Sequence, residues 1–103
     1  MTFNNRMNES VFAVEDSASD TVHTGEGRLR GVYMNFAATE GTVIFRDGGA
    51  SGTIICQFTT PAASTELDGI YIPIPGGGIE YSTDLYVAIT TTLEVTTFYA
   101  QGI

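Results

Sequence analysis

The sequence predicts an all-β protein: a single antiparallel β-sandwich, jelly-roll-like, of about eight short strands with an extended N-terminal arm. Three observations support this prediction. Threonine is abundant, and its branched side chain favours extended over helical backbone. Short apolar runs recur at regular spacing between turn signals rich in Gly, Pro, Asp and Ser. No stretch shows a convincing helical period.

The strongest local signal is a hairpin between Gly41 and Thr60. Two apolar runs, 42–45 and 53–58, are joined by a turn that begins Arg46-Asp47-Gly48-Gly49. Asp-Gly-Gly between two such runs favours a tight reversal, because glycine adopts positive φ angles at little cost. The hairpin is therefore the element around which the rest of the chain is expected to be organised.

Alternation along the hairpin predicts which side chains share a face. One face of its second strand would carry Ile54, Cys56 and Phe58, while Ile55 would lie on the opposite face. Ile44 lies on the corresponding opposite face of the first strand. Since both opposite faces carry an isoleucine, we expect a central hairpin that is covered on both sides.

The other strands follow from alternation and from proline. In 68–75, Ile70, Ile72 and Ile74 would face inward. Proline cannot donate to a ladder, so this strand is expected to lie at a sheet edge or to leave the sheet at Pro73. Further short strands are expected at 21–24, 28–36, 79–81, 85–89 and 93–99.

Two regions divide the chain: an N-terminal arm, 1–20, and a β-sandwich domain, 21–103. The arm carries one apolar patch, 11–14, which would dock onto a partner. The alternative is that this patch forms a first edge strand of the same domain. A length of 103 residues is typical of a single domain with one modest core.

The charge excludes two classes of partner. The net charge is −8, with four arginines and no lysine. Nucleic acids and anionic membrane surfaces are bound through cationic patches, so neither is an expected partner. No apolar run approaches the ~20 residues of a membrane-spanning helix, and residues 1–10 lack the features of a signal peptide. We therefore expect a protein made in a cytoplasm.

The sequence predicts no catalytic residue, no cofactor and no metal site. His23 is the single histidine and has no activated nucleophile near it in the chain, and Cys56 is the single cysteine. One Cys and one His are too few for a dedicated zinc site, and no calcium-loop pattern is present. A carboxylate pair such as Glu80 with Glu94 is the remaining enzymatic alternative.

The expected function is carried by contacts with other proteins. In a chain without lysine, the arginines of the domain are expected to pair with carboxylates within the domain or across a subunit contact. The arm would supply an apolar and cationic anchor. The candidate protein-contact residues are Phe3, Arg6, Val11, Phe12, Arg28, Arg30 and Arg46.

A resemblance adds to this interpretation. It covers the run from Gly27 to Tyr99 and is carried by the segments GRLRGVYMNFAATEGTVIFRDGGASGTIICQFTTP and IYIPIPGGGIEYSTDLYVAITTTLEVTTFYA. Their order of a Gly-rich strand, a GTVIFRDGG hairpin, a proline-edged IPIPGGGI and an STDLYV strand resembles small β-sandwich structural proteins of tailed bacteriophage virions. It is a pattern of strands and turns and contains no catalytic signature.

The resemblance implies a non-enzymatic virion protein, made in the host cytoplasm. Its expected role is that of a capsid decoration (cement) protein that binds the major capsid protein and itself forms a homo-oligomer. One alternative is a tail or fibre adaptor that binds another virion protein. An alternative of another class is a small carbohydrate-binding module that uses exposed tyrosines, with Tyr71, Tyr81, Tyr86 and Tyr99 as candidates.

Overall fold

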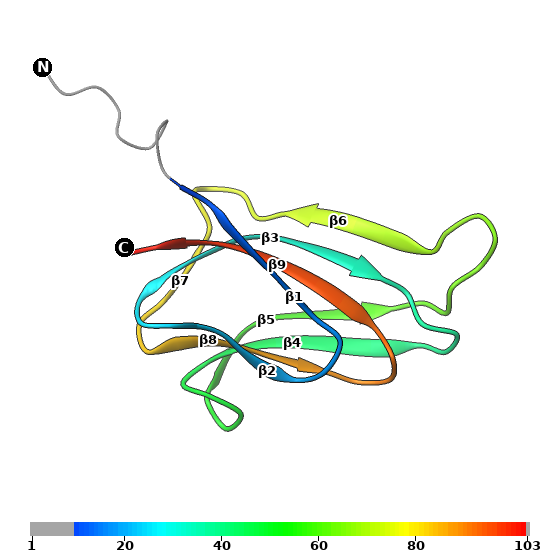
Figure 1. Ribbon diagram of the computed structural model, residues 1–103, viewed down its shortest axis with the longest axis horizontal. Helices are drawn as coiled ribbons and strands as arrows, with labels where there is room; N and C mark the ends of the chain where they lie inside the picture. The colour runs from blue at the N-terminus through cyan, green and yellow to red at the C-terminus, as the bar shows by residue number, and fades with distance from the viewer. Residues whose placement is uncertain (1–9, 103) are drawn as a thin grey trace, which may run out of the picture.

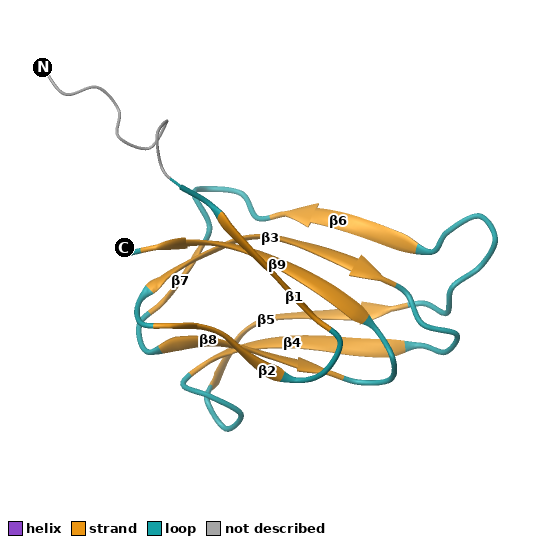
Figure 2. Cartoon of the chain, viewed as in Figure 1, coloured by secondary structure: helices purple, strands orange, loops and turns teal. Residues whose placement is uncertain are grey.

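The computed structural model describes residues 10–102. Within them the chain forms nine β-strands and no helix, arranged as two antiparallel sheets (Figures 1 and 2). The strands are β1 (Phe12–Asp16), β2 (Asp20–Thr24), β3 (Gly27–Asn35), β4 (Gly41–Asp47), β5 (Thr53–Thr60), β6 (Gly69–Pro73), β7 (Ile79–Tyr81), β8 (Asp84–Ile89) and β9 (Glu94–Gln101).

The order of the strands is that of a jelly roll. One sheet has the order β1-β9-β3-β6, with β7 also paired to β3, and the other has the order β2-β8-β4-β5. β6 and β7 pair with successive parts of the same edge of β3, so they form one edge strand interrupted by residues 74–78. With β6 and β7 counted as one strand, β1 pairs with β9, β2 with β8, β3 with β6–β7, and β4 with β5. This nesting is a jelly-roll arrangement, and it confirms the predicted fold class.

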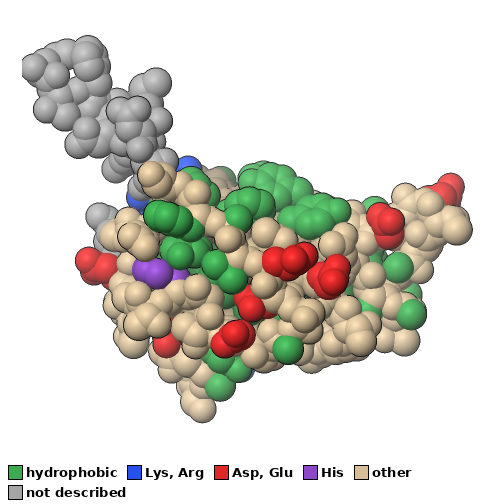
Figure 3. Space-filling view, viewed as in Figure 1, with side chains coloured by type: hydrophobic (Ala, Val, Ile, Leu, Met, Phe, Trp, Pro, Cys, Tyr) green, Lys and Arg blue, Asp and Glu red, His purple; other side chains and the backbone are tan. Residues whose placement is uncertain are grey.

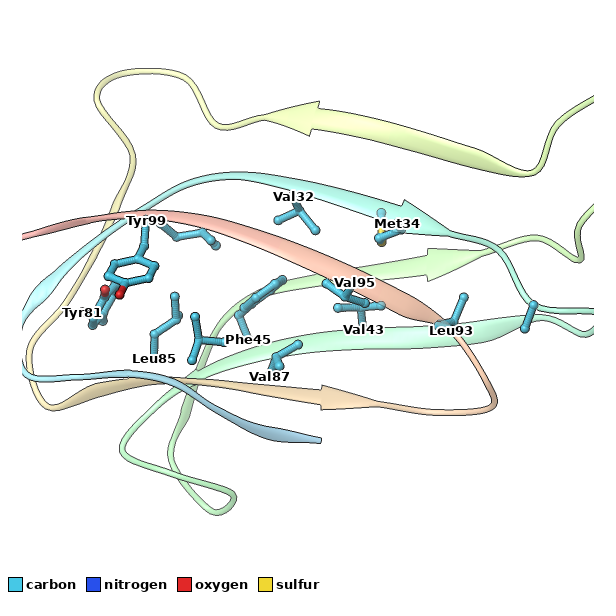
Figure 4. Close-up of a cluster of buried hydrophobic side chains, with 13 residues drawn as sticks. Val32, Met34, Val43, Phe45, Tyr81, Leu85, Val87, Leu93, Val95 and Tyr99 are labelled. Atoms are coloured by element: carbon cyan, nitrogen blue, oxygen red, sulfur yellow. The ribbon is translucent and has the colours of Figure 1, made fainter. Parts of the chain in front are cut away.

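The core lies between the two sheets and is built by alternation along each strand (Figure 4). Leu29, Val32 and Met34 of β3 face Val43 and Phe45 of β4 across the sandwich, and all five are buried. The remaining buried members are Val22, Ala37, Tyr81, Leu85, Val87, Leu93, Val95 and Tyr99.

The predicted faces of β5 need one correction. The register between β4 and β5 shifts between Phe45, which pairs with Cys56, and Arg46, which pairs with Ile54, so Ile55 is an extra residue in a β-bulge. Ile55 therefore packs against the core, and Ile54 is 47% exposed. The prediction that Ile54 shares a face with Cys56 was wrong, because one inserted residue reverses the alternation beyond it. The expectation of a central hairpin covered on both sides was also wrong, because β5 is the edge strand of its sheet and Ile54 is exposed on its outer face.

The apolar patch at 11–14 belongs largely to the sheet. Its residues from Phe12 onward form β1, which pairs with β9 from Phe12–Tyr99 to Asp16–Val95. The structure thus shows the edge-strand alternative for this patch. Two residues of the predicted arm contact, Phe3 and Arg6, lie outside the described residues.

The strand predicted from 68–75 lies at a sheet edge, as its prolines require. β6 ends at Pro73 and is the last strand in the order of its sheet. The chain then leaves the ladder through Gly76, Gly77 and Gly78, all with positive φ, and returns to β3 as β7. Glycine is favoured at these three positions, because L side chains rarely adopt such angles.

Candidate protein-contact surface

Exposed apolar side chains gather on the outer face of the five-stranded sheet. Because Val32 and Met34 point into the core, Tyr33 between them points outward, and its cross-strand partner Tyr71 points the same way. We call the group formed by Ala13, Tyr33, Tyr71, Pro73 and Phe98 the aromatic face. Tyr71 is 53% exposed and Tyr33 37% exposed. Figure 3 shows hydrophobic side chains gathered on the side of the molecule where β3, β6 and β9 lie.

Two glycines let the tyrosines lie flat on this face. A Cβ atom at Gly31 would be 2.8 Å from Tyr71 Oη, so the ring of Tyr71 occupies the space above that glycine. A Cβ atom at Gly69 would be 2.9 Å from Tyr33 Oη. Tyr71 also meets Phe98 of β9 edge-on, with ring centroids 5.8 Å apart. The aromatic face is therefore a packed surface held by contacts across three strands.

Acidic side chains border the aromatic face. Glu15 of β1 pairs with Thr96, and Glu94 of β9 pairs with Asn35, which places both exposed carboxylates on the same outer face at its far end. Figure 3 shows acidic side chains beside the hydrophobic group. This arrangement, an apolar centre with a negatively charged border, fits a protein surface that is apolar and flanked by basic residues.

The two described residues of the predicted arm contact lie at the start of β1, at an edge of the five-stranded sheet. Val11 is 48% exposed and Phe12 41% exposed. Phe12 stacks on Tyr99 with ring centroids 5.5 Å apart, so part of its ring is used within the domain. The next residue, Ala13, pairs with Phe98 of the aromatic face. Since Phe12 is opposite the core residue Tyr99, its side chain points to the core side of β1, away from the aromatic face, and lies at the edge of the sandwich.

The predicted arginines serve contacts inside the domain. Arg46 donates to the carbonyl of Gly52 at 2.8 Å and so spans its own hairpin turn. Arg28 donates to the carbonyl of Gly77 at 3.2 Å, and the side chain of Arg30 lies against Gly78. Arg28 and Arg30 therefore support the loop between β6 and β7, and the structure does not bring the three arginines together in one patch.

His23 belongs to an aromatic cluster at one end of the sandwich. Its Nδ1 lies 2.8 Å from Tyr81 Oη in a hydrogen bond, and its ring stacks on Tyr99 with centroids 4.6 Å apart. Burial raises the pKa of Tyr81, so its hydroxyl stays protonated at neutral pH. Two of the tyrosines considered for sugar binding, Tyr81 and Tyr99, are buried in this cluster (Figure 4).

Two aspartates join the β4–β5 turn to the turn before β8, a contact that was not predicted from the sequence. Asp47 accepts hydrogen bonds from the backbone N–H groups of Ser82, Thr83 and Asp84 at 2.8, 2.9 and 3.3 Å. In return, Asp84 Oδ1 accepts from the N–H groups of Gly48 and Gly49, both at 2.9 Å. We call this the Asp47–Asp84 network. An Asp before Gly-Gly and an Asp after Ser-Thr were the available signals, but only the fold brings them together.

One partly buried carboxylate is expected to destabilise the fold. Oδ2 of Asp16 is buried and has no hydrogen-bond partner within residues 10–102, and burial, followed by the charge of Asp20, raises the pKa of Asp16. A raised folded-state pKa means that the ionised carboxylate costs stability at neutral pH and that this cost disappears as the pH falls below the unfolded-state value. Asp16→Asn should therefore raise the melting temperature at pH 7 by about 2–4 °C, or about 0.5 kcal/mol.

The pH dependence of the melting temperature distinguishes this effect from a gain in stability that has another cause. At pH 3 the advantage of Asp16→Asn should be smaller, because the wild-type carboxyl is then largely protonated. Glu15→Gln, one residue away on the outer face, is the matched control and should leave the melting temperature nearly unchanged. Thermal denaturation followed by circular dichroism measures all three proteins, and an equal gain at both pH values would contradict the explanation.

Residues 10–102 contain no group of metal ligands and no membrane-spanning helix. Between residues 10 and 102, no three His, Cys, Asp or Glu side chains are grouped so that they could hold a metal ion. The same part of the chain has no helix long and apolar enough to cross a membrane. Neither a protein-family model nor a curated protein matches the chain.

Proposed function

We propose that the chain is a non-enzymatic structural protein of a bacteriophage virion, and specifically a capsid decoration (cement) protein that binds the major capsid shell. The observation that carries the proposal is the aromatic face. An exposed apolar group with a polar border is a common mark of a protein–protein contact. Tyrosine is also enriched in the centres of such contacts, since it buries a large area with few freely rotating bonds.

The architecture supports the proposal by analogy. Jelly rolls recur in viral capsid domains, although they also occur in lectins and other proteins, so the fold alone does not assign a function. The strand and turn pattern from Gly27 onward resembles small virion proteins of tailed phages. Both arguments favour the same class of protein.

Charge and symmetry support a capsid shell as the partner. With a net charge of −8, the protein would be repelled by packaged DNA and attracted to basic residues on a capsid surface. A shell presents many identical sites, so contacts of modest strength are sufficient when the decorating protein is itself multivalent. We assign Val11 and Phe12, at the β1 edge, to a second part of the contact, together with Phe3 and Arg6 of the preceding segment.

The proposal predicts that the tyrosines of the aromatic face are needed for particle binding. Particles lacking the protein would be incubated with the wild type or with Tyr33→Ser/Tyr71→Ser, and bound protein would be quantified by mass spectrometry after sedimentation. Occupancy at a fixed protein concentration below saturation should fall at least about tenfold, because two central aromatic contacts are lost. Tyr86→Ser, on the outer face of the other sheet, is the matched control.

The copy number in purified particles tests the role itself. On the order of hundreds of copies per particle would support capsid decoration, since a shell repeats its sites by symmetry. Absence from particles would overturn the virion proposal. Wild-type occupancy by the double tyrosine variant, with a normal melting curve, would overturn the assignment of the aromatic face. Deletion of residues 2–9 tests the preceding segment without removing β1.

Two other functions would give different results. A tail or fibre adaptor would be present in only tens of copies, because a tail has far fewer equivalent positions than a shell. A carbohydrate-binding module would use Tyr33 and Tyr71 as a stacking platform for sugar rings, which their exposure favours over the buried Tyr81 and Tyr99. A glycan array that binds the isolated protein, with loss of binding in Tyr71→Ser, would support that alternative.

A further inference from the structure

The sheet edges of this protein differ in how they are protected. β1 carries Glu15 and Asp16, β2 begins at Asp20, and the interrupted strand β6–β7 contains Pro73 and Glu80. Charges and prolines on an edge strand discourage another strand from pairing with it. Three of the four edges thus carry features that oppose edge-to-edge association.

The fourth edge, β5, lacks both kinds of protection. Its eight residues, TIICQFTT, contain no charged side chain and no proline. The charge-free stretch extends on both sides, because no charged residue occurs between Asp47 and Glu66. Within residues 10–102, β5 pairs only with β4, and no strand of that part of the chain covers the backbone N–H and C=O groups on its other side. The exposed Ile54 and the half-buried Phe58 lie on this strand.

We propose that β5 is a self-association edge, on which β5 of a second copy pairs antiparallel about a two-fold axis. The two four-stranded sheets then form one continuous sheet of order β2-β8-β4-β5-β5-β4-β8-β2. A two-fold axis places the β5 edges of the two copies side by side in antiparallel orientation. Each free backbone N–H of one strand can then face a free C=O of the other. The bulge at Ile55 lies near one end of β5 and leaves Cys56–Thr60 as the regular part of the edge.

The charge distribution argues for a second copy as the occupant. Two chains of net charge −8 repel each other wherever acidic side chains approach. β5 is the edge at which two such chains can meet without juxtaposing like charges, and it offers no charge to attract a strand of opposite sign. The association is independent of the proposed virion role, and it would concern the sheet that lies opposite the aromatic face.

The test compares two variants of β5 with a matched control. Gln57 and Thr59 are exposed and point to the outer face of the sheet, so Gln57→Lys and Thr59→Lys place like charges close together in the dimer without entering the core. Thr21→Lys adds the same charge on β2, at the opposite edge of the same sheet. Sedimentation equilibrium over a range of concentrations measures the dissociation constant of each full-length protein.

The wild type should sediment as a dimer of twice 11.0 kDa, and Gln57→Lys and Thr59→Lys should each raise the dissociation constant at least about fivefold. Each lysine lowers the net negative charge, so a general charge effect would tighten the dimer instead. Thr21→Lys should leave the dissociation constant of the dimer unchanged or slightly lower. Raising the salt from about 20 mM to about 200 mM should tighten the wild-type dimer, because salt screens the repulsion between the two acidic chains.

Several results would overturn the proposal. A wild-type protein that remains monomeric at millimolar concentration would show that a second copy does not pair with β5. This result would overturn the proposal even if another partner binds there. A dimer that tolerates both β5 lysines, or one that Thr21→Lys disrupts equally, would place the interface elsewhere. Thermal denaturation of each variant separates loss of association from loss of folding.

Discussion

Replacing Tyr81 with alanine is expected to lower the free energy of unfolding by about 4 kcal/mol, the largest effect of any prediction made for this chain. Tyr81 is 1% exposed and lies at one end of the core (Figure 4). It connects β7 of one sheet to His23 of the other through a hydrogen bond. A Cβ atom at Gly27 would lie only 2.5 Å from Tyr81 Oη, so the surrounding backbone is shaped to this ring. Removing the ring leaves a cavity that the sheets cannot readily close.

The phenylalanine variant separates the ring from its hydroxyl. Tyr81→Phe keeps the packing and removes only the 2.8 Å hydrogen bond to His23 Nδ1, so it should cost about 1 kcal/mol. Urea denaturation followed by circular dichroism gives both values. For a domain whose total stability is about 5–15 kcal/mol, the alanine variant should be partly unfolded at temperatures where the phenylalanine variant is intact. Equal losses of unfolding free energy in the two variants would show that Tyr81 stabilises the fold mainly through its hydroxyl and not through its ring.

Most of the fold could be predicted from local patterns. The glycine turn and the flanking apolar runs predicted the β4–β5 hairpin, and proline at position 73 predicted an edge strand. The error within β5 came from the bulge at Ile55, because alternation is reliable only while the ladder gains no extra residue. The patch at 11–14 had two open interpretations, and the one that the structure shows depends on pairing with β9, at the far end of the chain.

The candidate site was harder to predict than the strands. Tyr33, Tyr71 and Phe98 come from three strands, and their proximity follows from the order β9-β3-β6, which no local pattern contains. The tyrosines considered for sugar binding were chosen without knowledge of which face points inward, and Tyr81 and Tyr99 proved to be buried. The Asp47–Asp84 network depends in the same way on two turns that are brought together by the pairing of β4 with β8.

Replacing Asp47 with alanine is expected to lower the free energy of unfolding by about 3 kcal/mol. Its carboxylate accepts hydrogen bonds from three backbone N–H groups and from the hydroxyl of Ser82, at 2.8–3.3 Å. Hydrogen bonds to a charged group contribute about 1.5–3 kcal/mol each when buried, and solvent near this turn reduces that value. Asp47→Asn keeps the carboxyl-like shape with one acceptor oxygen, so it should cost less than alanine.

The pH dependence of stability provides a second measurement for Asp47. Hydrogen bonds from the backbone of Ser82, and then of Thr83 and Asp84, lower the pKa of this carboxyl, although burial acts in the opposite direction. A lowered folded-state pKa stabilises the fold above the unfolded-state value of about 3.9, and this contribution is lost as the pH falls through the folded-state pKa. The difference in stability between wild type and Asp47→Asn should therefore shrink below about pH 4. A difference that stays constant from pH 7 to pH 2 would contradict the role of the charge.

A double-mutant cycle decides whether Asp47 and Asp84 act as one network. Asp84 accepts from Gly48 and Gly49, which directly follow Asp47, while its own N–H donates to Asp47 Oδ1. Each aspartate thus fixes the turn that carries the other. Once one carboxylate is lost, the turn that the other carboxylate binds is less ordered. Asp47→Asn and Asp84→Asn should together cost less than the sum of the two single changes by about 1 kcal/mol.

Glu66→Gln, a change at an exposed loop residue, is the control and should show no coupling with either aspartate. Strict additivity of Asp47 and Asp84 would mean that the two turns are held independently, and that the pairing of β4 with β8 alone keeps them in contact.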